Sequence, residues 1–372
     1  MKIAVHTKEL ENARIDGTMV YIANVLHAMQ HMIGEDDLYL YHTRPYNVHV
    51  PIAEHPQMHD RTMPHCPVWT QTRFARALWQ DKCDVLWMPL HNMPYLRRKN
   101  MRTVVTIHDL AFKFYPQTFP TKDRFLINLC TDHAVRVADA VIAVSASTKK
   151  DLLAIYPSLR EDQIHVIHHG FDPHVWQKHV SVHDAHMTLQ RYGVRSRDYL
   201  IHVGAIQPRK NLTVLIDAFA QVKKESPQLK LVLVGGDGWL AQGIHAHIAR
   251  SPYKGDIVVT GNIAFADVHI LMQNASVCVL PSLYEGFGIS GLEAMAAGVP
   301  VVAADNSCFG EVLGDGAIYF DAKNVAKCAE AIATVLCDHD KKNILIAQAQ
   351  KRADMFSWEE CARKTLDVLR AR

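Results

Sequence analysis

Short apolar runs recur along the chain, and segments with a helical pattern of apolar positions separate them. The runs are continuous rather than alternating, as is typical of strands buried on both faces of a sheet. Strand followed by helix, many times over, predicts an α/β fold of parallel sheets with helices on both faces. The predicted strands are residues 2–6, 84–88, 103–107, 140–144, 165–168, 199–203, 230–234, 256–260, 276–280 and 299–303. The predicted helices are residues 18–32, 123–138, 147–154, 211–224, 266–274, 291–297 and 324–336.

The pattern is interrupted over residues 172–198, which are polar and rich in histidine, and a clean strand begins again at Tyr199. Because 372 residues also exceed what one ordinary hydrophobic core supports, we expect two doubly wound, Rossmann-like domains. Their expected bounds are 1–175 and 176–355. The remaining residues, 356–372, have the pattern of an amphipathic helix.

Composition argues against several classes of function. With 49% apolar and 21% charged residues the chain is a folded protein, and a net charge of +2 without a long basic run argues against a nucleic-acid partner. No stretch of about 18 uninterrupted apolar residues could span a membrane, and the first residues lack the apolar core of a signal peptide. We therefore expect a cytoplasmic protein.

The cysteines and histidines form no recognisable metal site. The eight cysteines include no C-x-x-C pair, and the 23 histidines are scattered without the H-E-x-x-H spacing. Asp338, His339 and Asp340 stand together in a charged stretch near the end of the chain, where a solvated turn explains them better. We predict no metal, and reduced thiols that are largely buried.

Unusual residues follow several predicted strands, where doubly wound sheets bind their ligands. Gly17 follows the first strand; it could let the backbone approach an anion, or a simple helix cap by Asp16 or Thr18 could explain the segment. His108 and Asp109 follow a later strand. This pair suits general acid or base chemistry, and a structural histidine explains it equally well.

Two adjacent cations, Arg209 and Lys210, stand between the strand 199–203 and the predicted helix 211–224. A cation at a helix N-terminus is unfavourable with respect to the helix dipole unless an anion binds there. The guanidinium fork of arginine and the point charge of lysine both suit phosphate oxygens. This conflict favours a phosphate ligand over a solvated pair.

Two glutamates, Glu285 and Glu293, stand eight positions apart around a Gly-Phe-Gly sequence. Ser290 and Glu293 have the spacing of a capping box, so a helix start is sufficient to explain Glu293. Glu285 has no such explanation. Backbone amides beside it can face an anion, and a carboxylate near a phosphate is better matched to the hydroxyls of an attached sugar.

Four segments carry a family resemblance. Along the chain they are TIHDLAF, HHGFD, GAIQPRKNL and LYEGFGISGLEAMAAGVP. The last segment contains Glu285 and Glu293 as an E-x7-E motif. In this order they resemble the retaining glycosyltransferases of family 4, which have the GT-B fold, and the likeness covers nearly the whole chain. GAIQPRKNL is similar to the family's donor-phosphate segment, HHGFD to the end of its first domain, and TIHDLAF to a segment of bacterial polysaccharide mannosyltransferases.

The resemblance implies roles for the residues of the donor site. Arg209 and Lys210 would neutralise the diphosphate of the donor, and Glu293 would accept hydrogen bonds from ribose hydroxyls. Glu285 would hold hydroxyls of the donor sugar near the anomeric carbon. Further contacts would come from the amides of Phe287, Gly288 and Ile289, from Gly17 at the diphosphate, and from His108 at the sugar, with His108 or Asp109 as a helper in proton transfer.

The implied reaction is transfer of a sugar, with retention, from a nucleotide sugar to a hydroxyl of a glycan or lipid-linked acceptor in surface polysaccharide synthesis. GDP-mannose is the expected donor, on the TIHDLAF likeness alone. No cofactor or metal is expected, because Arg209, Lys210 and helix-end amides can stabilise the leaving phosphate. The first domain would select the acceptor, and the final helix would cross back onto that domain.

A peripheral membrane contact is compatible with a lipid-linked acceptor. The run TRFARALW is a candidate, although a helix that faces the core explains it better.

Two departures from the family stand in the donor segments. Gly204-Ala205 replaces a frequent Gly-Arg, which would remove one phosphate contact, and Asp16-Gly17 replaces two glycines. Three rival functions fit the same architecture: a nucleotide-sugar epimerase, a phosphorylase, and a non-catalytic protein that binds nucleotide sugars.

Overall fold

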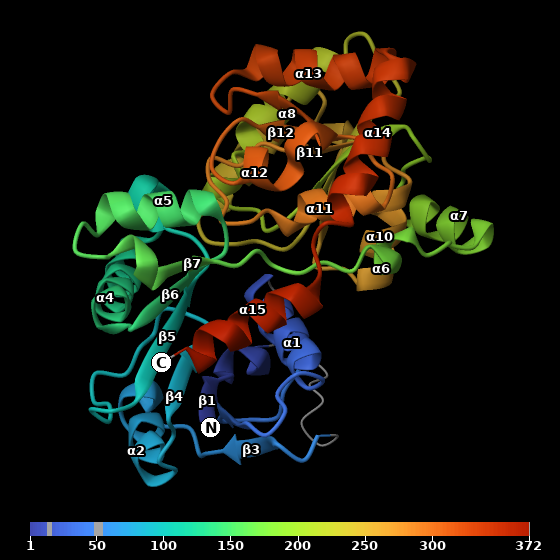
Figure 1. Cartoon of the computed structure of the whole chain (residues 1–372). Coiled ribbons are helices and arrows are strands. Elements are labelled where there is room, and N and C mark those ends of the chain that lie inside the picture. Colours follow the sequence, from blue (N-terminus) through green and yellow to red (C-terminus); the bar gives the residue numbers. More distant parts are fainter. Residues whose placement is uncertain (13–16, 48–54, 372) are drawn as a thin grey trace. The chain divides into compact units, whose positions relative to one another are not determined.

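The computed structural model describes residues 1–12, 17–47 and 55–371. The chain divides into two units, each built around one parallel sheet (Figure 1). The first unit comprises Met1–Leu110, Lys122–Gly170 and Phe356–Arg372, and the second comprises Ala111–Thr121 and Phe171–Met355.

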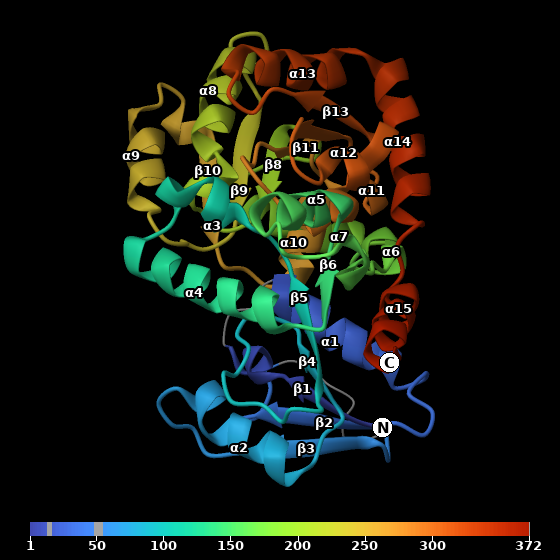
Figure 2. The same ribbon diagram turned by 60° about the vertical axis from the view of Figure 1, so that its left-hand side comes forward.

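Seven parallel strands form the sheet of the first unit, in the order β3-β2-β1-β4-β5-β6-β7 (Figure 1 and Figure 2). The order reverses between β1 and β4, which is where a doubly wound sheet binds its ligands. The strands are β1 Lys2–His6, β2 Asp37–His42, β3 Met58–Thr62, β4 Val85–Met88, β5 Arg102–Ile107, β6 Ala140–Ala143 and β7 Ile164–Val166. The helices are α1 Gly17–Met29, α2 Arg73–Gln80, α4 Thr121–Val137, α5 Ala146–Ile155 and α15 Trp358–Arg370, with 3-10 turns at Lys8–Glu11, Trp69–Gln71 and Glu161–Gln163.

Six parallel strands form the sheet of the second unit, in the order β10-β9-β8-β11-β12-β13. Here the order reverses between β8 and β11. The strands are β8 Tyr199–Val203, β9 Lys230–Val234, β10 Ile257–Gly261, β11 Val277–Leu280, β12 Val301–Ala304 and β13 Ala317–Phe320. The helices are α3 Ala111–Phe114, α6 Pro173–Gln177, α7 Val182–Arg191, α8 Leu212–Val222, α9 Gln242–Arg250, α10 Phe265–Gln273, α11 Ile289–Ala296, α12 Phe309–Leu313, α13 Val325–Cys337 and α14 His339–Ala353. The 3-10 turns are Pro116–Thr118, Pro208–Lys210, Lys254–Asp256 and Gly314–Gly316.

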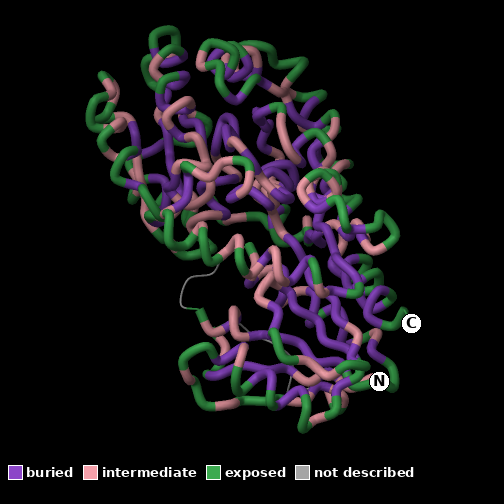
Figure 3. Tube along the Cα trace, turned by 90° about the vertical axis from the view of Figure 1, so that its left-hand side faces the viewer, coloured by how far each residue is buried: buried purple, intermediate pink, exposed green. Residues whose placement is uncertain are grey.

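The predicted fold class is confirmed, and each of the ten predicted strands is present within two residues of its expected bounds. Strands β6, β11 and β12 are buried along their whole length, as continuous apolar runs predict. Figure 3 shows that the buried residues of each unit gather in its interior. Strands β2, β3 and β13 were not predicted. β2 alternates polar with apolar residues, and β3 is an edge strand of sequence MHDRT whose residues are mostly not buried.

The polar segment 172–198 contains the helices α6 and α7. One expectation about a second polar segment is wrong. Asp338, His339 and Asp340 do not form a solvated turn: the Asp338 side chain accepts a hydrogen bond from the Lys341 amide and so caps α14. A cap residue followed by a polar first turn looks like a loop in sequence.

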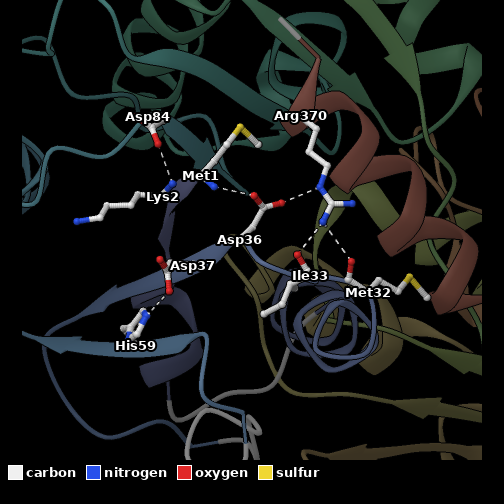
Figure 4. A network of polar contacts seen from close by, with 9 residues as sticks. All are labelled: Met1, Lys2, Met32, Ile33, Asp36, Asp37, His59, Asp84 and Arg370. Atoms are coloured by element: carbon white, nitrogen blue, oxygen red, sulfur yellow. Dashed lines mark hydrogen bonds and ion pairs between the residues drawn. The ribbon is translucent and has the colours of Figure 1, made fainter.

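The C-terminal helix α15 packs against α1 in the first unit. The Asp36 carboxylate accepts a hydrogen bond from the Met1 amino group and another from Nε of Arg370, each of 2.8 Å (Figure 4). Arg370 Nη2 also donates to the carbonyl oxygens of Met32 and Ile33. Although partial burial opposes it, the hydrogen bonds from the N-terminus and Arg370 lower the pKa of Asp36. The end of the chain is therefore tied to its beginning.

Helix α2 contains all of the run TRFARALW except Thr72, its N-cap residue, and turns its apolar side inward. Phe74 and Leu78 are fully buried, as a helix that faces the core requires. Within the described part of the chain, no helix is long and apolar enough to cross a membrane.

Candidate active site

Glu285 forms ion pairs with both cations that follow β8. Its Oε2 lies 2.9 Å from Nη1 of Arg209, and its Oε1 lies 2.6 Å from Nζ of Lys210. All three side chains are largely buried, with exposed fractions of 11% to 14%. Burial alone would raise the pKa of Glu285, but the charges of Arg209 and Lys210 outweigh it and hold that pKa well below its usual range. The cluster therefore carries one negative and two positive charges.

Backbone contacts between neighbouring strands bring these residues together. β8 and β11 are paired in the sheet, and the 3-10 turn Pro208–Lys210 follows β8. The Leu283 amide, in the loop after β11, donates to the Arg209 carbonyl, and Arg209 Nη1 donates to the Tyr284 carbonyl. Asn211 ends the turn in the left-handed region, at φ 54°, and its side-chain amide donates to the Pro281 carbonyl. The two loops are thus fixed to one another.

The sequence predicted that two cations stand at the N-terminus of a helix, against its dipole, and the structure does not place them there. Arg209 and Lys210 belong to the 3-10 turn, and α8 begins only at Leu212. The Glu285 carboxylate supplies the anion that the sequence argument assigned to a ligand. An arriving phosphate must therefore compete with Glu285 for these cations.

Glu293 does not belong to a capping box, which corrects the sequence interpretation. α11 begins at Ile289 and Gly288 is its N-cap residue, so Ser290 lies inside the helix and caps nothing. The Glu293 carboxylate has no hydrogen-bond partner among the described residues, and burial raises its pKa to about 7. The sequence indicated a structural role for Glu293 and none for Glu285. The structure shows the opposite, because Glu285 has two cationic partners and Glu293 has none among the described residues.

The N-terminus of α11 follows Glu285 after three residues. Gly288 adopts a φ of +77°, and a Cβ atom there would lie 2.8 Å from Cε1 of Phe309. Phe287 is buried, and Ile289 is the first residue of the helix. Phe287, Gly288 and Ile289 thus stand at the start of α11, and amides at a helix N-terminus favour an anion.

A buried histidine, His202, lies beneath this cluster and was not predicted. Its Nδ1 lies 2.9 Å from the Val279 carbonyl oxygen, which can only accept, so Nδ1 carries the proton. Burial, together with the Lys210 charge, lowers the pKa of His202 to about 4. Its Nε2 is a buried acceptor without a hydrogen-bond partner in the described residues, 3.2 Å from the position that a Cβ on Gly204 would take. A histidine inside the apolar run YLIHV was the available signal.

His108, Asp109 and Gly17 belong to the first unit, whereas the cluster of Glu285 with its two cations belongs to the second. His108 Nε2 lies 2.9 Å from the Pro89 carbonyl oxygen, and its ring packs edge-on against Tyr21 and His169. Asp109 follows it after β5. Gly17 is exposed at the start of α1 with no atom within 4 Å of a Cβ placed on it, and Asp16 lies outside the described residues.

A polar cavity of about 290 Å³ opens in the first unit after β1 and β2. Lys8, Glu11, Thr43, Arg44 and Asn92 are among its lining residues. The Glu11 carboxylate accepts hydrogen bonds from the amide and the hydroxyl of Thr43, which fixes that wall. Such an arrangement of carboxylate, amide, hydroxyl and cationic groups suits a molecule rich in hydroxyls.

The described residues contain no group of three or more His, Cys, Asp or Glu side chains that could hold a metal ion. All eight cysteines are free, and five of them are buried: Cys83, Cys278, Cys308, Cys328 and Cys361.

Two family models match the chain. The model of glycosyl transferases group 1 matches residues 192–352, and that of glycosyltransferase family 4 matches residues 22–175. Together the matches cover most of both units.

Similar proteins include transferases and a synthase. The O-antigen chain mannosyltransferase B of Escherichia coli is 29% identical over 283 residues, which are 74% of this chain and 71% of that protein. The alpha-maltose-1-phosphate synthase of Mycolicibacterium smegmatis is 30% identical over 251 residues, 64% of either chain. Among solved structures, Anabaena Alr3699/HepE in complex with UDP and glucose superposes with a TM-score of 0.77 at 20% identity, over 100% of both chains.

Proposed function

The chain belongs to the retaining glycosyltransferases of family 4, with their GT-B fold, and we propose that it transfers mannose from GDP-mannose to a hydroxyl of a glycan or lipid-linked acceptor in surface polysaccharide synthesis. The family uses nucleotide sugars as donors. The choice of mannose and of the acceptor class is supported by the likeness to the O-antigen mannosyltransferase and by the segment TIHDLAF.

The observation that carries the proposal is the contact of Glu285 with Arg209 and Lys210 beside the N-terminus of α11. Cations and helix-end amides stabilise the charge that develops on a leaving diphosphate. When the diphosphate binds Arg209 and Lys210, it takes over the contacts that Glu285 makes in the free protein. The Glu285 carboxylate then turns to the hydroxyls of the donor sugar.

The bond between the anomeric carbon and the phosphate oxygen breaks, and the acceptor oxygen forms a bond to the same face of that carbon. The acceptor's proton passes to the leaving phosphate oxygen. Arg209 and Lys210 hold that phosphate in place while its negative charge increases. His108, with Asp109 beside it, is assigned to the sugar from the first unit.

Glu293 is assigned to the ribose of the donor. A carboxyl whose pKa is about 7 and which lacks a protein partner is costly to ionise in the free protein. Two ribose hydroxyls would supply the donors that the carboxylate lacks. Binding of the nucleotide would therefore lower the pKa of Glu293.

The polar cavity of the first unit is assigned to the sugar end of the acceptor. Its lining includes Lys8, Arg44, Glu11 and Asn92, which can exchange hydrogen bonds with the hydroxyls of a glycan. This lining suits a saccharide rather than an acyl chain.

Incubation of the protein with a panel of nucleotide sugars tests the proposal. We expect GDP-mannose to be hydrolysed slowly, and transferred when a mannose-containing acceptor is added. Glu285→Gln should abolish both reactions, whereas Glu225→Gln, a change at an exposed glutamate of the same unit, should leave them intact. If UDP-glucose were the sole donor used, the assignment of GDP-mannose would be wrong, and the donor would match the UDP and glucose bound by the Anabaena protein.

The same panel separates the rival functions. An isomeric nucleotide sugar formed without an acceptor would indicate an epimerase, and a requirement for inorganic phosphate would indicate a phosphorylase. Binding of a nucleotide sugar without any turnover would indicate a non-catalytic protein.

A further inference from the structure

His202 is a buried base beside the cluster of Glu285 with Arg209 and Lys210. It lies in β8, next to β11, where the strand order of the second sheet reverses (Figure 2). The residue is 1% exposed, and its Nδ1–H group donates to the Val279 carbonyl oxygen at 2.9 Å. No described residue donates a hydrogen bond to the other ring nitrogen, Nε2. Buried polar atoms are almost always paired, so an acceptor left bare in the free protein requires an explanation.

The bare nitrogen and the Lys210 ammonium border the same small space. A Cβ atom on Gly204 would lie 3.2 Å from Nε2 of His202, and 3.3 and 3.5 Å from Cε and Nζ of Lys210. The glycine keeps this space free of a side chain. Burial, followed by the charge of Lys210, lowers the pKa of His202 to about 4. The ring is therefore uncharged at neutral pH, and Nε2 is an acceptor there.

The Lys210 ammonium has more donors than the free protein uses. An ammonium group carries three N–H donors, and in the described part of the chain Nζ has one hydrogen-bond partner, Glu285, at 2.6 Å. In the proposed function the diphosphate of the donor replaces Glu285 at this nitrogen. A phosphate approaches from one side, so at least one N–H donor of Lys210 still faces the protein. His202 offers an acceptor on that side.

We propose that His202 is a positioning residue, whose Nε2 accepts a hydrogen bond from Lys210 when the donor is bound and so holds the ammonium on the phosphate. This role rests on the proposed function, in which Lys210 exchanges Glu285 for the diphosphate. In the free protein Nζ is drawn to Glu285, and Nε2 stays bare. An uncharged acceptor suits this place better than a carboxylate, because it orients the ammonium without neutralising the charge that stabilises the leaving phosphate.

A purely structural histidine is the alternative. The bond from Nδ1 to Val279 would then be its whole role. Two substitutions separate the roles of the ring nitrogens, because the amide of an asparagine reaches the position of Nδ1 and that of a glutamine reaches the position of Nε2. His202→Asn keeps a donor for Val279 and loses the acceptor beside Lys210. His202→Gln keeps the acceptor and loses the donor.

Titration calorimetry with GDP, or with UDP if the donor panel selects it, tests the proposal on the full chain. His202→Asn should bind the nucleoside diphosphate about tenfold more weakly, and His202→Gln should bind it within about threefold of the unchanged protein. Urea denaturation should give the opposite order, with His202→Gln the less stable variant, because it loses the bond to Val279. A structural histidine would give the same order in both measurements.

A Lys210→Met background makes the test specific. If His202 acts through Lys210, His202→Asn should change the affinity in that background by less than about twofold, because the interaction is already absent. His269→Asn is the matched control, at a buried histidine of the same unit whose Nε2 lies 3.1 Å from the Trp176 carbonyl oxygen. It should lower stability and leave nucleotide binding unchanged.

His202→Phe keeps the test decisive if the asparagine variant does not fold. Phenylalanine fills the volume of the imidazole and offers no acceptor, so the same loss of about tenfold is expected.

Three outcomes would overturn the proposal. The first is that His202→Asn and His202→Phe bind the nucleoside diphosphate as the unchanged protein does. The second is that His202→Gln loses as much affinity as His202→Asn. The third is that the loss persists undiminished in the Lys210→Met background. Failure of the proposed function would look different, because Lys210→Met by itself would then leave the affinity unchanged.

Discussion

Nζ of Lys210 lies 2.6 Å from Oε1 of Glu285, so a cation expected at the donor phosphate and a carboxylate expected at the donor sugar contact one another in the free protein. Arg209 completes the cluster from the other carboxylate oxygen. Each charge thereby has a partner before any ligand binds, which avoids the cost of leaving charges buried and unpaired. On the proposed function, donor binding would exchange the partners of these charges rather than fill an empty cationic site.

Lys210→Met should weaken the binding of the donor's nucleoside diphosphate by about 10- to 100-fold, since a hydrogen bond to a charged group contributes about 1.5–3 kcal/mol. Binding of the corresponding nucleoside should not change, because it has no phosphate. Titration calorimetry measures both affinities. Lys224→Met, at an exposed lysine of the same unit, is the control. Equal losses for nucleoside and nucleoside diphosphate would contradict the phosphate assignment.

The pKa of Glu293 gives a prediction about stability and pH. The folded state holds the proton of Glu293 up to about pH 7, whereas the unfolded state releases it near 4.5. The carboxyl therefore does not destabilise the fold below the lower value, and its destabilising effect increases as the pH rises from 4.5 to about 7. Glu293→Gln should raise the free energy of unfolding by about 1–3 kcal/mol at pH 8 and change it little at pH 5.

Urea denaturation at the two pH values checks this prediction. Glu225→Gln, at an exposed glutamate, should show no such pH dependence. If Glu293→Gln changes the free energy of unfolding equally at both pH values, the pKa of the Glu293 carboxyl is not raised in the folded protein.

Gly288→Ala should destabilise the protein by about 2 kcal/mol or more. Alanine is strained at a φ of +77°, and its Cβ would lie 2.8 Å from Phe309. Gly243→Ala is the matched control, since nothing lies within 4 Å of a Cβ in that position of α9; it should be neutral or stabilising by up to about 1 kcal/mol. Thermal unfolding of both variants makes the comparison. Equal stability of the two would exclude a close packing of α11 on α12.

Arg370→Ala should lower the free energy of unfolding by about 1 kcal/mol. Arg370 contacts the Asp36 carboxylate and also the carbonyl oxygens of Met32 and Ile33, in the turn that follows α1. Arg363→Ala removes exposed pairs within α15 itself and should cost less than about 0.5 kcal/mol. Chemical denaturation distinguishes the two. The reverse order of the two costs would show that the contact to Asp36 does not hold α15 in place.

The parallel sheets were predictable because a continuous apolar run such as AVIA in β6 is stable only as a strand buried on both faces of a sheet. β3 was not, because an edge strand can be polar and its pairing with β2 depends on residues far away in sequence. Glu285, Arg209 and Lys210, which the structure brings into contact, could be singled out from the sequence because each follows a strand.

Their partners were not predictable. The spacing of Ser290 and Glu293 suggested a cap, but the N-cap is the left-handed Gly288, two residues earlier. The contact of Glu285 with Arg209 joins residues 76 positions apart, and only the pairing of β8 with β11 brings them together. His202 was missed because a lone histidine inside a strand is ordinarily a core residue.

The exchange of partners at Glu285 is tested most directly by nucleoside diphosphate binding to Glu285→Gln. If the diphosphate replaces Glu285 at Arg209 and Lys210, a neutral side chain competes less, and the affinity should rise by about fivefold while sugar transfer falls at least about 100-fold. Calorimetry and a transfer assay on one preparation give both values. A lower affinity for the diphosphate, or transfer at the unchanged rate, would contradict the account.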